Sequence, residues 1–237
     1  MTPDGLRPHS TYINASFIEG YHNDESFIIT QDPMPNTAED FWRMVTEHKI
    51  RTMVQLTEPD GSWLYYPEAS TRPEADGGGG LTFSEFGSMR VSLDSVDDSK
   101  GGSYVARELT VYNGKADESV RLTHFAFKKW PSGDNKLPDK TQGLLDLVEH
   151  ATAHKTEMKR SGPIAVHCRL GSDRSSVYVA LSCLVQQLKT ESRADVFTVV
   201  RKLRSQRQGM VQTLPQYRFI YRAISDYVDL YNRCCGH

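Results

Sequence analysis

Residues 163–189 place the strongest constraint on how this chain can fold. The apolar, strand-like run "PIAVHC" ends at Cys168 and leads through a short loop of small and polar residues into a helical segment that begins near Arg174. In such a unit, the N–H groups of the loop and the free N–H groups at the positive end of the helix dipole point into one small space. We therefore expect an α/β protein with an anion site at the carboxyl end of this strand.

The rest of the chain alternates between strand-like and helix-like patterns. We expect strands at 27–31, 51–57, 81–93, 104–113, 120–130 and 163–168, and helices at 37–49, about 141–158, 174–189, 193–206 and 214–232. Thr37 is the expected N-cap of the first helix, and residues 67–80 have the composition of a loop. The predicted fold class is α/β, a highly twisted mixed β-sheet flanked by helices. Because no repeat or linker interrupts the pattern, we expect residues 1–237 to form a single domain.

Composition excludes several classes of function. A net charge of −2 at pH 7, with no sustained basic stretch, gives no case for nucleic-acid binding. The chain has no run of about 18 apolar residues, so we expect no direct membrane insertion by this domain. The cysteines and histidines form no metal-ligand spacing, so we expect no metal, no cofactor and a reduced, cytosolic setting. The cysteines are Cys168, Cys183, Cys234 and Cys235.

The loop after Cys168 contains the residue types needed for phosphate chemistry. The positive field of the helix terminus favours the thiolate of Cys168, which can attack phosphorus, and Arg174 can bind two phosphate oxygens at once. The Cys-x5-Arg spacing alone is more typical of a core cysteine followed by a surface arginine. Its place between strand and helix, with His167 before the cysteine and Ser175 after the arginine, favours a nucleophile in an anion site.

This loop and four other segments resemble the tyrosine-specific protein phosphatases. The segments are "YINASFIEGY" (12–21), "FIITQDPMPNTAEDFWRMVTEHK" (27–49), "RELTVYN" (107–113) and "QTLPQYRFIY" (212–221). They run in the family's order along nearly the whole chain, and they are most similar to the second, membrane-distal phosphatase-like domain of receptor-type enzymes. The resemblance implies that Cys168 is the nucleophile, that Arg174 binds phosphate and that the Ser175 hydroxyl assists turnover of the thiophosphate. It also implies a phosphate cradle formed by Arg169, Leu170, Gly171, Ser172, Asp173 and Arg174, and two water-orienting glutamines, Gln212 and Gln216.

One departure from the family falls on the general acid. The family's Trp-Pro-Asp loop protonates the leaving tyrosine oxygen, whereas this chain has Trp130, Pro131 and Ser132. A serine hydroxyl is no useful acid near neutral pH, and general acid catalysis is typically worth about 10²- to 10⁴-fold in rate. Asp134 could replace the missing acid only if the loop were rebuilt.

Two further departures fall inside or beside the cradle. Asp173 stands where the family has glycine, and two interpretations are open. In the first interpretation, the carboxylate faces the site, where its repulsion of a negative charge at about 7 Å would cost about 2 kcal/mol per unit charge. In the second interpretation, the carboxylate points to solvent or pairs with Arg169. Ser176 replaces a second family glycine, with a smaller expected cost.

The resemblance and these departures predict a regulatory phosphatase-like domain of a receptor. We expect this domain to be catalytically weak or inactive and still able to bind phosphotyrosine. The alternatives are an active protein tyrosine phosphatase that works through a thiophosphate on Cys168, and a purely structural module. The expected partner is a phosphotyrosine protein or the adjacent catalytic domain of the same receptor. The expected location is the cytoplasmic side of the plasma membrane, as part of a single-pass receptor. We expect the domain to lack the family's N-terminal helices and phosphotyrosine-recognition segment, because no matching tyrosine stands before Tyr12 in this sequence.

Two remaining patterns have an ordinary structural interpretation. The stretch 191–207 is basic at one end, and a helix with a solvated charged face and with Val196, Val199, Val200 and Leu203 turned inward explains it better than an interaction patch does. Tyr217, Phe219 and Tyr221 are expected core contacts of the last helix.

Overall fold

A computed structural model describes residues 12–22, 26–58, 63–68, 82–98, 102–133 and 136–235, the last five as backbone only. The described strands are β1 (Ala15–Ile18), β2 (Phe27–Gln31), β3 (Thr52–Gln55), β4 (Thr82–Phe86), β5 (Met89–Asp97), β6 (Tyr104–Asn113), β7 (Glu118–Phe127) and β8 (Ile164–Cys168). The described helices are α1 (Ala38–Glu47), α2 (Gln142–Glu157), α3 (Asp173–Glu191), α4 (Val196–Gln206) and α5 (Leu214–Cys235). None of these helices is long and apolar enough to cross a membrane.

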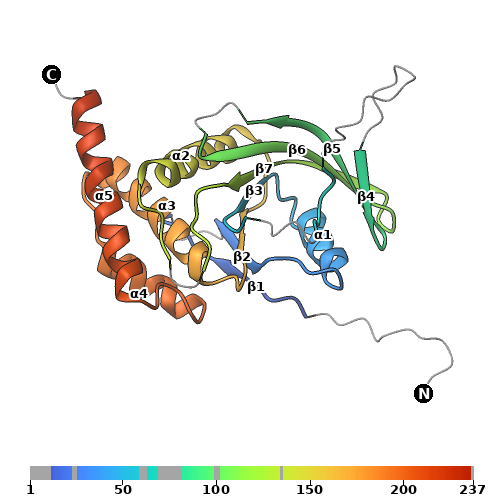
Figure 1. Cartoon of the computed structure of the whole chain (residues 1–237), viewed down its shortest axis with the longest axis horizontal. Coiled ribbons are helices and arrows are strands. Elements are labelled where there is room, and N and C mark those ends of the chain that lie inside the picture. The colour runs from blue at the N-terminus through green and yellow to red at the C-terminus, as the bar shows by residue number, and fades with distance from the viewer. Residues whose placement is uncertain are drawn as a thin grey trace.

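The described strands form one mixed sheet in the order β1-β2-β8-β3-β7-β6-β5-β4. The four strands β2, β8, β3 and β7 are mutually parallel, and the pairs on either side of this block are antiparallel. Helices α2 to α5 gather on one side of the sheet and α1 lies on the other (Figure 1). The prediction of a twisted mixed sheet flanked by helices is confirmed.

Each face of the sheet supports its own hydrophobic core, as the alternating side-chain directions of a strand require. Along β2, Phe27 and Ile29 pack with α2 to α5, whereas Ile28 packs with Phe41 and Trp42 of α1. The sheet is therefore apolar on both faces, as expected for parallel strands covered by helices.

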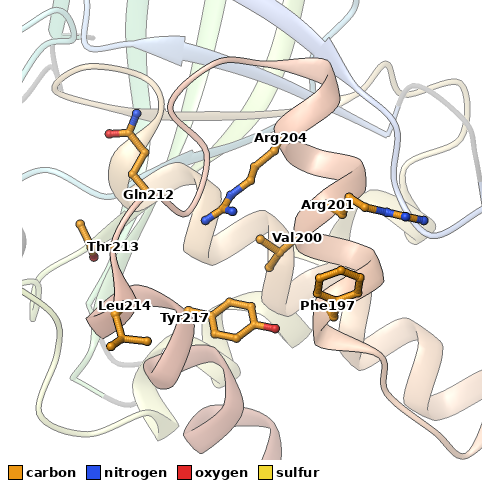
Figure 2. Close-up of a pocket in the computed structure, with 8 residues that line it drawn as sticks. All are labelled: Phe197, Val200, Arg201, Arg204, Gln212, Thr213, Leu214 and Tyr217. Carbon is orange, nitrogen blue, oxygen red and sulfur yellow. The ribbon is translucent and has the colours of Figure 1, made fainter.

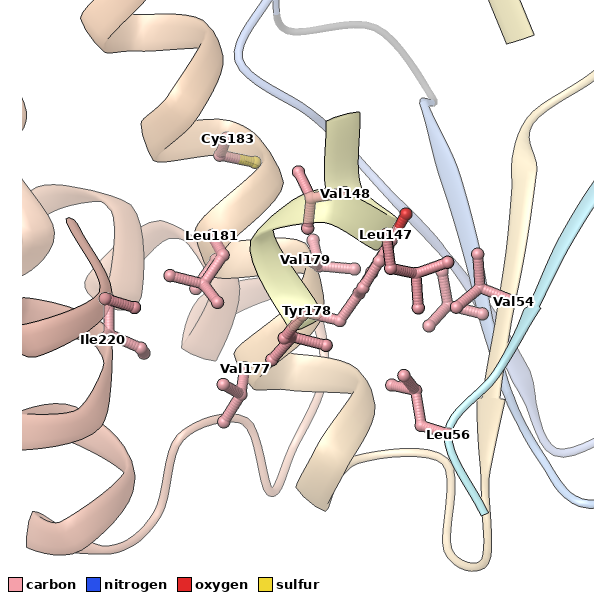
Figure 3. Packing of buried hydrophobic residues seen from close by; sticks show 14 of the residues in the cluster. Val54, Leu56, Leu147, Val148, Val177, Tyr178, Val179, Leu181, Cys183 and Ile220 are labelled. Atoms are coloured by element: carbon pink, nitrogen blue, oxygen red, sulfur yellow. The ribbon is translucent and has the colours of Figure 1, made fainter. Parts of the chain in front are cut away.

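Helix α3 lies at the centre of the larger core. Its residues 177–181 are all fully buried, and they contact α2, α5 and the sheet (Figure 3). A helix that is buried all round cannot shift without disturbing several neighbours. Its first turn, which begins at Asp173, is consequently held in a fixed position at the end of β8.

Three local predictions were wrong or incomplete. Residues 81–93 do not form one strand, because the turn at Gly87 and Ser88 divides the stretch into β4 and β5. Gly87 has a φ of +60°, a backbone conformation that favours glycine, and its turn lies against the Glu39 carboxylate. Strand β1 was not predicted. Thr37 precedes α1, but its hydroxyl bonds to Met34 instead of capping the helix. Residues 69–80 of the expected loop and the side chains of Cys234 and Cys235 lie outside the described part of the chain.

Candidate active site

The candidate site lies where the carboxyl ends of the four parallel strands meet. Such ends are the usual ligand-binding edge of an open α/β sheet. Strand β8 ends at Cys168, and its parallel neighbours β2 and β3 lead into Asp32 and into Leu56 and Thr57. The segment that follows β7 carries Trp130. The topology therefore brings residues from four distant parts of the sequence around the loop at 169–172.

Backbone hydrogen bonds fix the shape of this loop. The Cys168 carbonyl accepts the N–H groups of Gly171 and Asp32, each at 2.9 Å, and the Arg169 N–H donates to the Thr57 hydroxyl at 3.0 Å. Gly171 has a φ of +66°, and a Cβ on it would lie 2.5 Å from the backbone nitrogen of Gln31. A tight, glycine-dependent loop thus precedes the free N–H groups of the first turn of α3.

Arg207 holds this loop from outside, and sequence reasoning did not identify it. Its Nε donates to the Gly171 carbonyl, its Nη1 to the Ser16 hydroxyl and its Nη2 to Asn14 Oδ1, each at 2.7 Å. Burial lowers the pKa of Arg207 from its ordinary value. All three acceptors are distant in sequence, so no local pattern indicated this role.

Cys168 lies at the floor of the cradle and is 1% exposed. The Ser175 hydroxyl, itself fully buried in the first turn of α3, donates a hydrogen bond to Cys168 Sγ at 3.1 Å. A donated hydrogen bond and a helix N-terminus both favour negative charge on sulfur. The thiol and the hydroxyl therefore lie in the arrangement expected of a nucleophile and its supporting group.

Arg174 connects the cradle to the loop that would carry the general acid. Its Nη1 donates to the Leu56 carbonyl at 3.0 Å and its Nη2 to the Pro131 carbonyl at 3.3 Å. Its guanidinium carbon lies 5.5 Å from the centre of the Trp130 ring. A guanidinium has five N–H donors, so three remain for phosphate oxygens. Ser132 follows directly on this packed segment and is exposed. Asp134 lies outside the described residues.

Asp173 has a partner that neither interpretation of the sequence anticipated. Its Oδ1 accepts a short hydrogen bond from Gln216 Nε2. Gln216 Oε1 accepts a hydrogen bond from the Thr213 backbone N–H at 3.1 Å. The Gln216 backbone N–H in turn donates to the Thr213 hydroxyl at 3.3 Å. These reciprocal bonds form a capping box at the start of α5. Both ends of the buried Gln216 amide are thus engaged inside the protein, whereas Gln212 is exposed.

Ser176 also makes bonds, where we expected only a cost. Its fully buried hydroxyl donates to the Asp173 carbonyl at 2.6 Å and accepts the Val211 N–H at 3.0 Å. Val211 has a φ of +47°, which is unfavourable for a β-branched residue. Ser176 therefore fixes a strained turn of the 207–213 loop against the start of α3.

A buried chain of hydrogen bonds runs behind the cysteine. Asp32 Oδ1 lies 2.7 Å from His167 Nδ1, and the Tyr65 hydroxyl lies 2.8 Å from His167 Nε2 and 3.0 Å from His124 Nε2. The carboxylate requires a proton on His167 Nδ1, so in the neutral ring Nε2 accepts the Tyr65 proton and Tyr65 in turn accepts from His124. Burial holds the pKa of His124 well below its usual range. The residue before the nucleophile is therefore fixed in one orientation.

The remaining cradle residues differ in exposure. Leu170 is 66% exposed, and Ser172 is half-buried before the first residue of α3, where its side chain caps no N–H group. Within the described ranges, no three His, Cys, Asp or Glu side chains are placed to hold a metal ion. The arrangement can bind a phosphate and present a sulfur nucleophile to it.

Comparison with known proteins agrees with this arrangement. Residues 4–226 match the family described as protein-tyrosine phosphatase. The chain is 42% identical over 236 residues to tyrosine-protein phosphatase 69D of Drosophila melanogaster, which covers 98% of this chain and 15% of that protein. It is 34% identical over 230 residues to receptor-type tyrosine-protein phosphatase epsilon of Homo sapiens, with 94% and 31% covered. It is also 34% identical over 238 residues to tyrosine-protein phosphatase Lar of Drosophila melanogaster, with 98% and 11% covered. The chain spans less than a third of each of these relatives.

Proposed function

The chain belongs to the protein-tyrosine phosphatase family, and from this premise we propose that it is a regulatory phosphatase-like domain that binds phosphotyrosine and hydrolyses it weakly or not at all. The observation that carries the proposal is the contact between Arg174 and the Pro131 carbonyl. The loop is packed against the phosphate-binding arginine, yet the next residue, Ser132, offers no acid. The cradle is built for an anion, and the position after Pro131 carries no useful proton donor.

The lack of an acid at Ser132 affects cleavage of the bond between phosphorus and the tyrosine oxygen. When the Cys168 thiolate attacks phosphorus, the bond from phosphorus to the tyrosine oxygen breaks, and that oxygen leaves as an unstable anion unless it receives a proton. Without a general acid, we expect a rate lower by about 10²- to 10⁴-fold, or about 3 to 5 kcal/mol of barrier. Binding of the phosphate does not depend on this proton.

A second candidate function is an active tyrosine phosphatase that works through a thiophosphate on Cys168. The bond from the Ser175 hydroxyl to Cys168 Sγ favours it, because this bond stabilises the thiolate both before attack and as a leaving group. The missing acid argues against ordinary family rates on phosphotyrosine.

We also propose that the domain occupies the membrane-distal position of a single-pass receptor phosphatase, on the cytoplasmic side of the plasma membrane. Its partner would be a phosphotyrosine protein or the adjacent catalytic domain of the same receptor. Support comes from relatives named as receptor-type phosphatases and from the degraded acid loop.

Titration of a phosphotyrosine peptide and of the same peptide with plain tyrosine tests the binding. Activity is then compared between the phosphopeptide and an aryl phosphate whose leaving group needs no proton. We expect phosphate-dependent binding, little peptide turnover, and a rise in peptide kcat/KM for Ser132→Asp that is larger than the rise on the aryl phosphate. Peptide turnover at ordinary family rates, abolished by Cys168→Ser, would establish the active phosphatase instead. Absence of phosphate-dependent binding would favour a structural module.

A further inference from the structure

Asp32 holds the end of β8 at two points. Its backbone N–H donates to the Cys168 carbonyl at 2.9 Å, and its carboxylate oxygen Oδ1 lies 2.7 Å from His167 Nδ1. His167 is fully buried, and the Asp32 side chain is only 26% exposed. The fold therefore places a carboxylate behind the nucleophile, a position that was not predicted from the sequence.

The net charge of this pair depends on the number of protons on His167. An imidazolium beside a carboxylate makes a pair with no net charge, whereas a neutral imidazole leaves the negative charge of Asp32 uncompensated. The groups on the other side of the ring decide between these two states. They are Tyr65 and His124, which continue the buried chain of hydrogen bonds.

A neutral His167 satisfies each hydrogen bond of this chain. Its Nδ1–H donates to Asp32, its Nε2 accepts the Tyr65 proton, and the Tyr65 oxygen accepts the Nε2–H of His124. His124 Nδ1 then carries a lone pair and no proton. Arg107 pairs with His124 across β6 and β7, and Arg107 Nη1 and His124 Nδ1 are both buried without a hydrogen-bond partner among the described residues. A bare ring nitrogen suits a guanidinium neighbour.

A charged His167 would break this arrangement. Its Nε2 would then donate to Tyr65, so Tyr65 would have to donate to His124 Nε2, and the His124 proton would have to move to Nδ1. That N–H group would be buried without an acceptor beside the Arg107 cation, which is unfavourable. Burial, together with Arg107, also holds the pKa of His124 well below its usual range. The chain therefore favours a neutral His167 and leaves the Asp32 charge uncompensated.

Other charged groups surround Cys168 from the cradle and from the loop after α4. They are Arg169, Asp173, Arg174 and Arg207. Arg174, Arg207 and the N-terminus of α3 favour a thiolate. Arg204 is held apart, because it donates to the Met210 carbonyl at 3.2 Å and lines the groove between α4 and the start of α5 (Figure 2). Asp32 opposes the thiolate through a buried ring, where salt and water screen its charge poorly.

We propose that Asp32 is a positioning residue that, through His167, holds Cys168 as the neutral thiol near neutral pH. The functional meaning of this inference rests on the proposed function. A neutral sulfur at the floor of the cradle does not repel a phosphate dianion as a thiolate would. The same neutral sulfur is a poor nucleophile. Asp32 therefore shifts the site from hydrolysis of a phosphotyrosine ligand towards binding of it.

Alkylation of the unmodified chain with iodoacetamide measures the thiolate, and peptide mass mapping follows Cys168 separately. Asp32→Asn keeps an acceptor for His167 Nδ1 and removes the charge. At about pH 6, we expect Cys168 to react about tenfold faster in this variant, the order for removal of one partly screened charge. At about pH 10, where an ordinary thiol is ionised, the two rates should converge. A merely structural role of Asp32 would change the rate by the same factor at both pH values.

A second carboxylate of the same sheet provides the matched control. Asp94 on β5 is also partly buried, and it accepts a hydrogen bond from Thr110 at 2.7 Å. Asp94→Asn should leave both rates unchanged. Asp32→Ala removes the charge and the acceptor together, and it should react at least as fast as Asp32→Asn. A gain in Asp32→Ala alone would assign the effect to the hydrogen bond and overturn the proposal, as would equal pH profiles for Asp32→Asn and the unmodified chain.

Titration with a peptide that carries a non-hydrolysable difluoromethylphosphonate analogue of phosphotyrosine separates the two proposals. If this peptide binds and Asp32→Asn leaves alkylation unchanged, the Asp32 inference fails and the proposed function stands. If Asp32→Asn accelerates alkylation at low pH and the peptide does not bind, Asp32 controls the thiol and the proposed function fails.

Discussion

Two buried serines on α3 should respond oppositely to removal of the hydroxyl group. Ser176 bonds to the Asp173 carbonyl and to the Val211 N–H, whereas the equally buried Ser182 Oγ has no partner among the described residues. In Ser176→Ala, the Val211 N–H stays buried without an acceptor, which costs about 1–3 kcal/mol. In Ser182→Ala, an unbonded hydroxyl leaves the core, so stability should stay unchanged or rise by about 1 kcal/mol.

The two variants make the same chemical change on the same helix, so the small gain in helix propensity from alanine cancels in the comparison. We expect their unfolding free energies to differ by about 1–4 kcal/mol, with Ser176→Ala the less stable. Urea unfolding at one pH, with equal m values, measures this difference. Hydrogen exchange of the 207–213 segment should also quicken in Ser176→Ala alone. Equal stabilities, or a greater loss in Ser182→Ala, would refute the assignment of Ser176 as the residue that fixes the loop.

Three further predictions concern the site and its support. Removing the negative charge in Asp173→Asn should lower the Kd for a phosphotyrosine peptide by about tenfold in calorimetry. An unchanged Kd would refute the idea that the Asp173 carboxylate opposes phosphate binding. Cys168 should react with iodoacetamide faster than the equally buried Cys183, as followed by peptide mass mapping, and equal slow labelling would show that the cradle does not activate its thiol. Burial lowers the pKa of His124 below its ordinary value of 6.5. As the pH falls, this histidine therefore takes up a proton in the unfolded chain before it does so in the folded protein. The stability that His124 contributes above pH 6.5 is lost as the pH falls below that value. His124→Gln should flatten that loss, whose slope is at most about 1.4 kcal/mol per pH unit, in urea unfolding at several pH values; an unchanged slope would place the titrating group elsewhere.

The sequence predicted those parts of the site that depend on local order along the chain. Cys168, Arg174 and Ser175 stand within one strand–loop–helix unit, so their spacing indicated which side chains would meet at the start of α3. The same reasoning predicted nearly all of the helices and strands, because each has its own periodicity. Strand β1 was not predicted because its four residues are too few to show a clear alternation of apolar and polar side chains.

The parts that could not be predicted depend on contacts between distant segments. Arg207 reaches the Gly171 carbonyl only because the loop before α5 folds back on the cradle. The Tyr65 hydroxyl stands between two histidines because β7 and β8 both flank β3. Tyr221 looked like a core residue because periodicity identifies a helical face but cannot tell whether anything covers it.

The departures in the cradle are better explained by a fixed binding surface than by random decay. An unselected hydroxyl at Ser176, which is fully buried, would have left a polar group without a partner, at a cost of about 1–3 kcal/mol. Instead, Asp173 binds the Gln216 amide in the first turn of α5, and Ser176 binds Val211 in the 207–213 loop, so the two residues tie both segments to the first turn of α3. If Gln216 is to orient a hydrolytic water, as the family resemblance implies, its amide must first leave Asp173. The same contacts that make the cradle rigid therefore oppose the hydrolytic step, while a rigid cradle loses less entropy when it binds a phosphate.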